Sequence, residues 1–132
     1  MTRGDRVAVM LRNAPIHVVA QFAIAGVGGI AVSCNTRLTA TELRTQIADS
    51  GANVIIADET FAHVVREALD DCVLNSRQIV ILWAPHDQLN NSNASALPWF
   101  PKATSAQLAS NTFQFMFTSG TTGRPKGVVH TQ

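Results

Sequence analysis

Apolar residues in the first two thirds of the chain form short continuous runs that alternate with helical stripes. The runs predict four buried strands, at residues 6–11, 30–32, 53–57 and 78–83. They lack polar alternation, which is expected when helices cover both faces of a sheet. Strands that alternate with helical stretches predict an α/β fold with a largely parallel sheet.

The first predicted helix has clear start and stop signals. Asn13 is expected to cap it, and Pro15 suits its first turn because no amide donor is needed there. The glycines at 28–29 are expected to end it. Between these signals, apolar residues recur at helical spacing and predict one continuous stripe: Ile16, Val19, Ala20, Ala23, Ile24 and Val27.

Two further helices are predicted before residue 73. Thr39 and Glu42 fit a capping box, in which hydroxyl and carboxylate reciprocally satisfy free backbone donors, and this helix is expected to end at 50–51. Glu59 is favourably placed near the positive end of the next helix. That helix is predicted from a second apolar stripe: Phe61, Val64, Val65, Ala68, Leu69 and Cys72.

The pattern changes after the fourth predicted strand. Residues 84–111 have no period and several breakers, so they are expected to form an irregular connection. Order returns at residue 112, and the aromatic, alternating run at 113–117 predicts a strand. We therefore expect 112–132 to hold a strand followed by a loop with its own chemistry.

Composition excludes several classes of protein. Hydrophobic residues make up 46% of the 132 residues and charged residues 14%, which excludes a disordered chain. The formal net charge is +1 without a polybasic run, so we expect no nucleic-acid partner. The apolar stretch at 18–32 is interrupted by Gln21 and three glycines and is too short to span a membrane. The first residues do not resemble a signal peptide, so a cytoplasmic location is expected.

Cysteine and histidine spacing predicts no metal site. Cys34 and Cys72 lie far apart, which favours two buried, reduced thiols. The four histidines have no ligand spacing. His130 follows the loop described next, and two hypotheses stay open for it: a packing histidine or a substrate-side role.

The segment 118–127 concentrates the residues that bind phosphate. Its glycines permit positive φ and close approach to a ligand, and successive amides in such a loop can bind an anion. Lys126 adds a positive charge. A Walker-type loop is disfavoured because Pro125 precedes that lysine and Gly127 follows it, where Ser or Thr would hold magnesium. A surface turn between two strands remains the alternative interpretation.

The run at 117–129 resembles the signature phosphate-binding loop of the adenylate-forming superfamily, T-S-G-T-T-G-x-P-K-G-V. Residues 4–13, 26–32 and 35–39 are also similar to early segments of that family. The resemblance implies part of the large N-terminal domain of an acyl-CoA synthetase (acyl-CoA ligase). It also implies a loop that binds the β- and γ-phosphates of ATP, made of Thr118, Ser119, Gly120, Thr121, Thr122, Gly123 and Lys126.

Such an enzyme activates a carboxylic acid with ATP and Mg²⁺ as an acyl-adenylate, releases pyrophosphate, and then forms a thioester with coenzyme A. The family's magnesium-positioning residue, adenine and ribose sites and catalytic lysine lie beyond its phosphate loop. The resemblance therefore implies a partial AMP-binding domain over 1–132, a fragment that lacks the remainder of its own domain, holds no catalytic or metal-binding residue and is inactive alone. Arg124 occupies the variable position of the motif and is expected to face solvent.

Three alternatives stay open from the sequence. The chain could be a non-catalytic nucleotide-binding remnant or regulatory domain, or a compact NTPase. It could also belong to a peptide-synthetase-type adenylation domain, in which a carrier protein replaces coenzyme A. The acid substrate is not readable from these residues.

Overall fold

The computed structural model describes residues 2–70, 79–84, 112–118 and 126–131. In these parts strands and helices alternate along the chain. The elements are β1 (Arg6–Met10), α1 (Pro15–Gly26), β2 (Ile30–Ser33), α2 (Ala40–Ser50), β3 (Val54–Asp58), the short 3₁₀ helix η1 (Glu59–Phe61), α3 (Ala62–Leu69), β4 (Val80–Ala84), β5 (Thr112–Thr118) and β6 (Lys126–Thr131).

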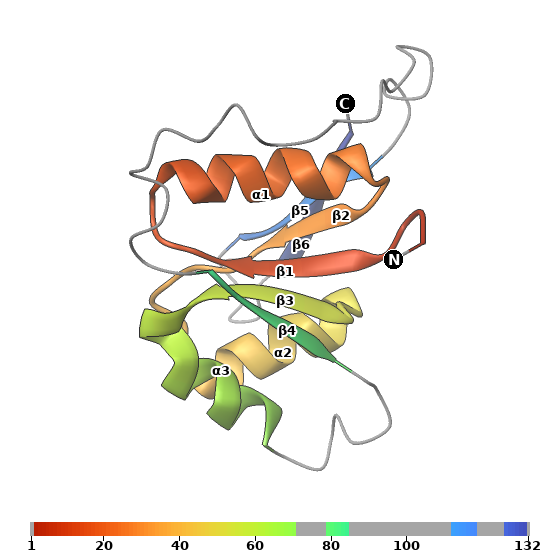
Figure 1. Cartoon of the computed structure of the whole chain (residues 1–132). Helices are drawn as coiled ribbons and strands as arrows, with labels where there is room; N and C mark the ends of the chain where they lie inside the picture. The colour runs from red at the N-terminus through yellow and green to blue at the C-terminus, as the bar shows by residue number, and fades with distance from the viewer. Residues whose placement is uncertain (1, 71–78, 85–111, 119–125, 132) are drawn as a thin grey trace.

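The strands form one sheet in the order β4-β3-β1-β2-β5-β6. Strands β1 to β5 are parallel, and β6 pairs antiparallel with β5. Helix α1 covers one face of the sheet, while α2 and α3 cover the other (Figure 1). This arrangement confirms the predicted α/β fold with a largely parallel sheet.

Two apolar cores hold the layers together. The core under α2 and α3 contains Met10, Leu43, Ile47, Ile55 and Val65, among others. The core under α1 contains Val7, Val9, Leu11, Ala20, Ile24 and Ala31. Strand β1 contributes to both cores, so its residues from Val7 to Met10 are at most 1% exposed. Burial on both faces is the reason that this strand shows no polar alternation.

The capping box of α2 forms as predicted. The backbone amide of Glu42 donates to Thr39 Oγ1 at 3.3 Å, and the backbone amide of Thr39 donates to Glu42 Oε2 at 2.8 Å. The bond from the Thr39 amide, together with one from the Thr39 hydroxyl to the same oxygen at 2.9 Å, holds the pKa of Glu42 below its ordinary value. The helix ends at Gly51, whose φ of 70° is readily adopted only without a side chain.

The start of α1 differs from the prediction. Ala14, not Asn13, is the N-cap residue, and no side chain caps the helix. Pro15 causes this, because it occupies the first helical position and requires an extended residue directly before it; Ala14 has φ −147° and ψ 162°. The predicted apolar stripe is also incomplete, since Ala23 and Val27 are exposed. The end of the helix agrees with the prediction, with Gly28 at φ 76°.

The boundaries near the irregular connection and the loop also need correction. Ala84, expected at the start of the connection, is the last residue of β4 and is buried. Lys126 and Gly127, expected in the loop, begin strand β6; a strand after the loop is part only of the alternative interpretation as a turn between two strands. Residues 85–111 and Cys72 lie outside the described residues. No helix in the described parts of the chain is long and apolar enough to cross a membrane.

Candidate functional site

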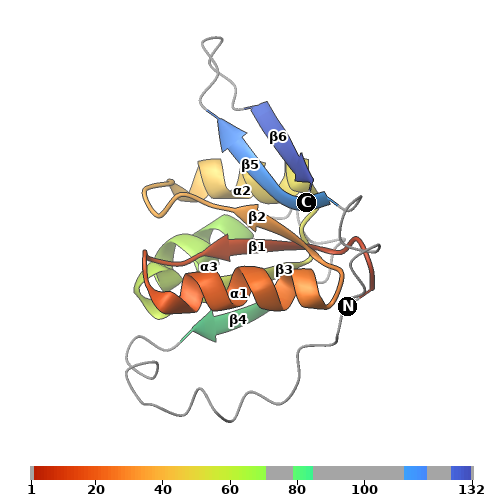
Figure 2. The same cartoon turned by 90° about the horizontal axis from the view of Figure 1, so that it is seen from above.

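The hairpin of β5 and β6 brings together the two ends of the predicted phosphate loop. Thr118, the last residue of β5, pairs with Lys126, the first residue of β6. The Oγ1 hydroxyl of Thr118 donates to the backbone carbonyl of Lys126 at 3.4 Å. The hairpin forms one side of the sheet, beyond β2 (Figure 2).

Two of the seven expected phosphate-binding residues are therefore placed. The side chains of Thr118 and Lys126 are exposed at the end of the hairpin where the loop connects the two strands. The other five lie outside the described residues: Ser119, Gly120, Thr121, Thr122 and Gly123. A hydroxyl and an ammonium at the two ends of one loop are suited to an anionic ligand.

The loop leaves the sheet at the edge where ligands bind in parallel α/β folds. Strand β5 lies parallel to β2, which lies parallel to β1, so their carboxyl ends share one edge. The chain passes from β1 to β2 and then returns to β3 on the other side of β1. The crossovers consequently leave β1 and β2 toward opposite faces, and ligand crevices form at this kind of switch point.

His130 lies away from the loop. It is exposed on β6 and stands opposite Gln114 in the hairpin. Four strand positions separate it from Lys126, which corresponds to about 14 Å along an extended strand. The structure does not bring His130 together with the ends of the loop.

Gln114 ties the hairpin to the centre of the sheet. Its Nε2 atom donates to the Oγ atom of Ser33 at 2.6 Å, across the pairing of β5 with β2. Sequence reasoning missed this contact, because the two residues are 81 positions apart. The bond fixes β5 against β2 and so helps to position the strand that carries the loop.

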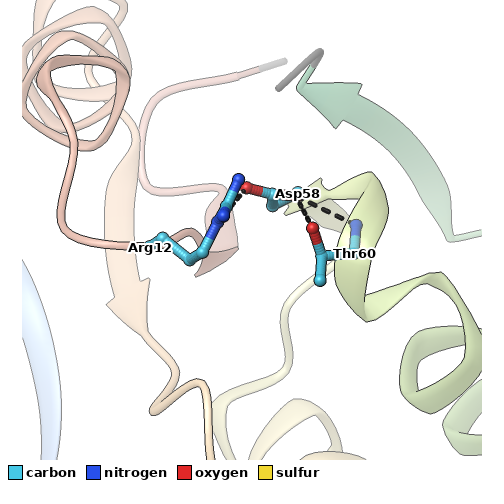
Figure 3. A network of polar contacts seen from close by, with 3 residues as sticks. All are labelled: Arg12, Asp58 and Thr60. Atoms are coloured by element: carbon cyan, nitrogen blue, oxygen red, sulfur yellow. Dashed lines mark hydrogen bonds and ion pairs between the residues drawn. The ribbon is translucent and has the colours of Figure 1, made fainter. Parts of the chain in front are cut away.

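A polar network at the same edge joins β1 to β3 (Figure 3). Asp58, at the end of β3, accepts hydrogen bonds from the Thr60 amide at 2.9 Å and the Thr60 hydroxyl at 2.7 Å. Its other oxygen lies 2.8 Å from the Nε atom of Arg12, which follows β1. Burial opposes the charged form of Asp58, but the bonds from Thr60 and Arg12 outweigh it and lower the pKa of this carboxyl.

The sequence did contain a signal for part of this network. Asp58 precedes Thr60 by two positions at a strand end, which is the spacing of an Asx turn. Nothing in the local sequence indicates that Arg12 is the partner.

A cavity of about 380 Å³ opens beside the base of the loop. Its lining comes from five parts of the chain: the turn after β1 (Leu11, Asn13), the first turn of α1 (His17), residues 33–36, α2 (Gln46) and β5 (Met116, Phe117). None of these residues is Asp, Glu, Lys or Arg, so the described lining carries no formal charge.

Gln46 is the unusual residue of this lining. It is 7% exposed, and its Oε1 atom has no hydrogen-bond partner in the described structure. An unpartnered buried amide oxygen costs about 1–3 kcal/mol, so it calls for an explanation. Gln46 was not singled out from the sequence, although it lies between Leu43 and Ile47 on the inward face of α2.

The cavity contains one thiol, that of Cys34. It is buried, as the sequence predicts, and burial raises its pKa to about 12, so it is a thiol rather than a thiolate at neutral pH. Among the described residues no group of three His, Cys, Asp or Glu side chains is arranged to hold a metal ion.

Known proteins resemble the chain over its whole length. The family described as AMP-binding enzyme matches residues 1–132. The long-chain-fatty-acid–CoA ligase FadD13 of Mycobacterium tuberculosis is 36% identical over 99% of this chain and 25% of its own length. The crotonobetaine/carnitine–CoA ligase of Citrobacter koseri is 33% identical over 98% of this chain and 26% of its own length. The chain thus spans about a quarter of the length of these curated relatives.

Solved structures of acyl-CoA ligases also match almost the whole chain. The inhibitor-bound N-terminal domain of FACL13 from Mycobacterium tuberculosis superposes with a TM-score of 0.77 and 30% identity, over 99% of this chain and 32% of that one. The fatty acyl CoA synthetase of Mycobacterium tuberculosis superposes with a TM-score of 0.76 and 31% identity, over 99% of this chain and 25% of that one.

Proposed function

Because the chain belongs to the AMP-binding enzyme family, we propose that it is the phosphate-binding part of an ATP-dependent acyl-CoA ligase. The observation that carries the proposal is the register of the hairpin. It places Thr118 and Lys126 at the two ends of one loop, at the carboxyl edge of the sheet. The activity is proposed for an enzyme of the relatives' length, here called the complete enzyme, which is about four times as long as this chain.

The first proposed step joins the acid to ATP. A carboxylate oxygen attacks the α-phosphorus, a new C–O–P link forms, and the bond from that phosphorus to the leaving pyrophosphate breaks. Negative charge grows on the pyrophosphate as it leaves. Donors held at that position lower the barrier, which is the role proposed for the Lys126 ammonium and for Ser119–Gly123. The Thr118 hydroxyl has one proton, so its proposed bond to phosphate replaces its bond to the Lys126 carbonyl.

The second proposed step transfers the acyl group. The thiol of coenzyme A attacks the acyl carbon of the adenylate, the C–O bond to AMP breaks, and the thiol proton passes to a base. No residue of this chain is assigned to the second step. Magnesium is proposed to accompany ATP, and no described residue is assigned to it.

The proposal also assigns ranges of this chain to parts of one domain. We propose that 1–132 is a partial AMP-binding domain, in which 112–132 contributes strands β5 and β6 with the phosphate loop between them, and 85–111 connects this hairpin to β4. The hydrogen bond between Gln114 and Ser33 supports this division, because it anchors β5 to the β1–β2 side of the sheet. His130 keeps a substrate-side role only as a hypothesis, since its position lies away from the loop.

Acid-dependent exchange of labelled pyrophosphate into ATP tests the proposal. The complete enzyme should catalyse this exchange and form a coenzyme A thioester, detected by mass spectrometry, with at least one acid from a panel. The panel should contain a long-chain fatty acid, carnitine and 3-hydroxybenzoate, the acids in the names of similar ligases. The 132-residue chain alone should catalyse neither reaction. Exchange without thioester would instead support a carrier-protein acceptor, and no exchange would refute the proposal.

A further inference from the structure

The cavity beside the loop has a lining that selects against charge. Its described residues include uncharged polar and apolar side chains. No Lys or Arg side chain is among them that could compensate the charge of an anion. A carboxylate or phosphate that enters this site loses part of its hydration and gains no ion pair from these residues, which is unfavourable. The cavity therefore suits an uncharged ligand group, and its volume of about 380 Å³ lies within the range of small-molecule sites.

Gln46 indicates which uncharged group fits. Its side chain belongs to the cavity lining, is buried, and leaves its Oε1 atom without a partner in the described structure. An amide oxygen can only accept a hydrogen bond. The oxygen itself is buried, so a ligand reaches it only after rotation about the last torsion of the side chain, which is broad in glutamine. A ligand that donates a hydrogen bond would satisfy it.

His17, in the first turn of α1, adds a complementary group to the lining. The Nε2 atom of Gln21 lies 3.2 Å from the Nε2 atom of His17, and an amide nitrogen can only donate. This contact places the proton of the neutral imidazole on Nδ1, which makes that atom a donor. Leu11, Met116 and Phe117 supply apolar contacts in the same cavity.

We propose that this cavity binds an uncharged amide or hydroxyl group, carried on a small apolar body, and that Gln46 accepts its hydrogen bond. The same chemistry is available from two sources: the uncharged end of the acid substrate, or a separate small molecule. Binding by the chain does not depend on the proposed ligase activity, so the two proposals fail separately.

Benzamide and benzoate are matched probes, since they have the same shape and differ in charge. Titration of the 132-residue chain, followed by NMR, should show saturable binding of benzamide with shifts at residues 33–36. Benzoate should bind about tenfold more weakly or worse, because no cation compensates its charge. Absence of saturable benzamide binding, or equal binding of benzoate, would overturn the proposal.

Three variants separate binding from folding. Gln46→Met keeps the length of the side chain and removes the amide, so it should weaken benzamide about tenfold while the free energy of unfolding stays equal or rises. Thr45→Val is the control, because Thr45 bonds the Thr41 carbonyl and does not line this cavity; it should leave affinity unchanged. Met116→Trp should fill the cavity and block binding. Unchanged benzamide affinity in Gln46→Met would overturn the role of Gln46.

The complete enzyme distinguishes the two sources. If benzamide raises KM for the acid without changing kcat, the uncharged end of the acid occupies the cavity. If benzamide changes kcat at saturating acid, a separate small molecule occupies it. If benzamide binds to neither the chain nor the complete enzyme, the cavity is not a site of this class.

Discussion

The Nε atom of Arg12 lies 2.8 Å from the Oδ2 atom of Asp58, an ion pair between residues 46 positions apart. It joins the turn after β1 to the end of β3, at the edge of the sheet that also carries the cavity and the loop. Arg12 is 41% exposed, so solvent screening reduces its contribution to about 0–1 kcal/mol. The two bonds from Thr60 to the same carboxylate therefore provide most of the stabilisation.

The isosteric change Asp58→Asn should lower the free energy of unfolding by about 1–2 kcal/mol, because it removes the charge that these hydrogen bonds stabilise. Arg12→Gln should cost less, within about 1 kcal/mol. Urea unfolding followed by circular dichroism measures both. Glu59→Gln, at the exposed neighbouring acid, is the matched control and should change the free energy by no more than about 0.5 kcal/mol. Equal losses in Asp58→Asn and Glu59→Gln would contradict the role of the network.

The same carboxyl makes stability depend on pH. The pKa of Asp58 is lowered in the folded chain from its ordinary value of 3.8. Its contribution is therefore complete above the unfolded pKa and is lost as pH falls below 3.8 through the folded pKa. Urea unfolding between about pH 6 and pH 2 should show this loss in the unsubstituted chain and a smaller one in Asp58→Asn. If the free energy of unfolding changes with pH in the same way in both proteins, the role of Asp58 in this pH dependence is refuted.

The face of the sheet that carries α1 leaves large apolar side chains exposed. Val18 is 55% exposed and Phe22 58%, on the outer side of α1. Val80 and Leu82 of β4 are each 51% exposed. They are in register with Val54 and Ile56, which pack against the core under α1. Apolar surface of this kind promotes association.

We therefore expect the 132-residue chain to self-associate, and the double change Val18→Gln with Phe22→Gln to reduce it. Because both side chains are more than half exposed, the loss of stability should stay within about 1 kcal/mol. Sedimentation velocity measures the association. Ile24→Gln is the contrasting variant: at 4% exposed, it should destabilise the fold by about 3 kcal/mol or more. A monodisperse unsubstituted monomer would be the contrary result.

Local signals predicted the elements well where a few adjacent residues decide the structure. Thr39 and Glu42 form their capping box from two side chains three positions apart. Gly28 and Gly51 end their helices because they adopt positive φ. Asn13 failed as a cap for an equally local reason, since Pro15 fixes the first helical position and leaves Ala14 before it. The local sequence does contain the information for this cap, but Pro15 decides it rather than Asn13.

The site could be predicted only in part, because its contacts join distant segments. The motif predicts the loop, but Lys126 and Gly127 belong to strand β6 because they pair with Thr118 and Phe117 across the hairpin. The pairs Arg12–Asp58 and Gln114–Ser33 depend on the order of strands in the sheet, which no local pattern contains. Gln46 faces inward on α2 among apolar residues, and only the packed structure indicates that its oxygen lacks a partner.

The central claim is that the loop held between Thr118 and Lys126 binds the phosphates of ATP during adenylate formation. The most direct measurement compares the two half-reactions of the complete enzyme carrying Lys126→Ala. Adenylate formation, followed as pyrophosphate release, should slow about 100-fold, the usual effect of losing one donor to a developing charge. Thioester formation from supplied acyl-adenylate should change little, and Arg124→Ala should leave both rates near normal. Equal losses in the two half-reactions with Lys126→Ala would contradict the account.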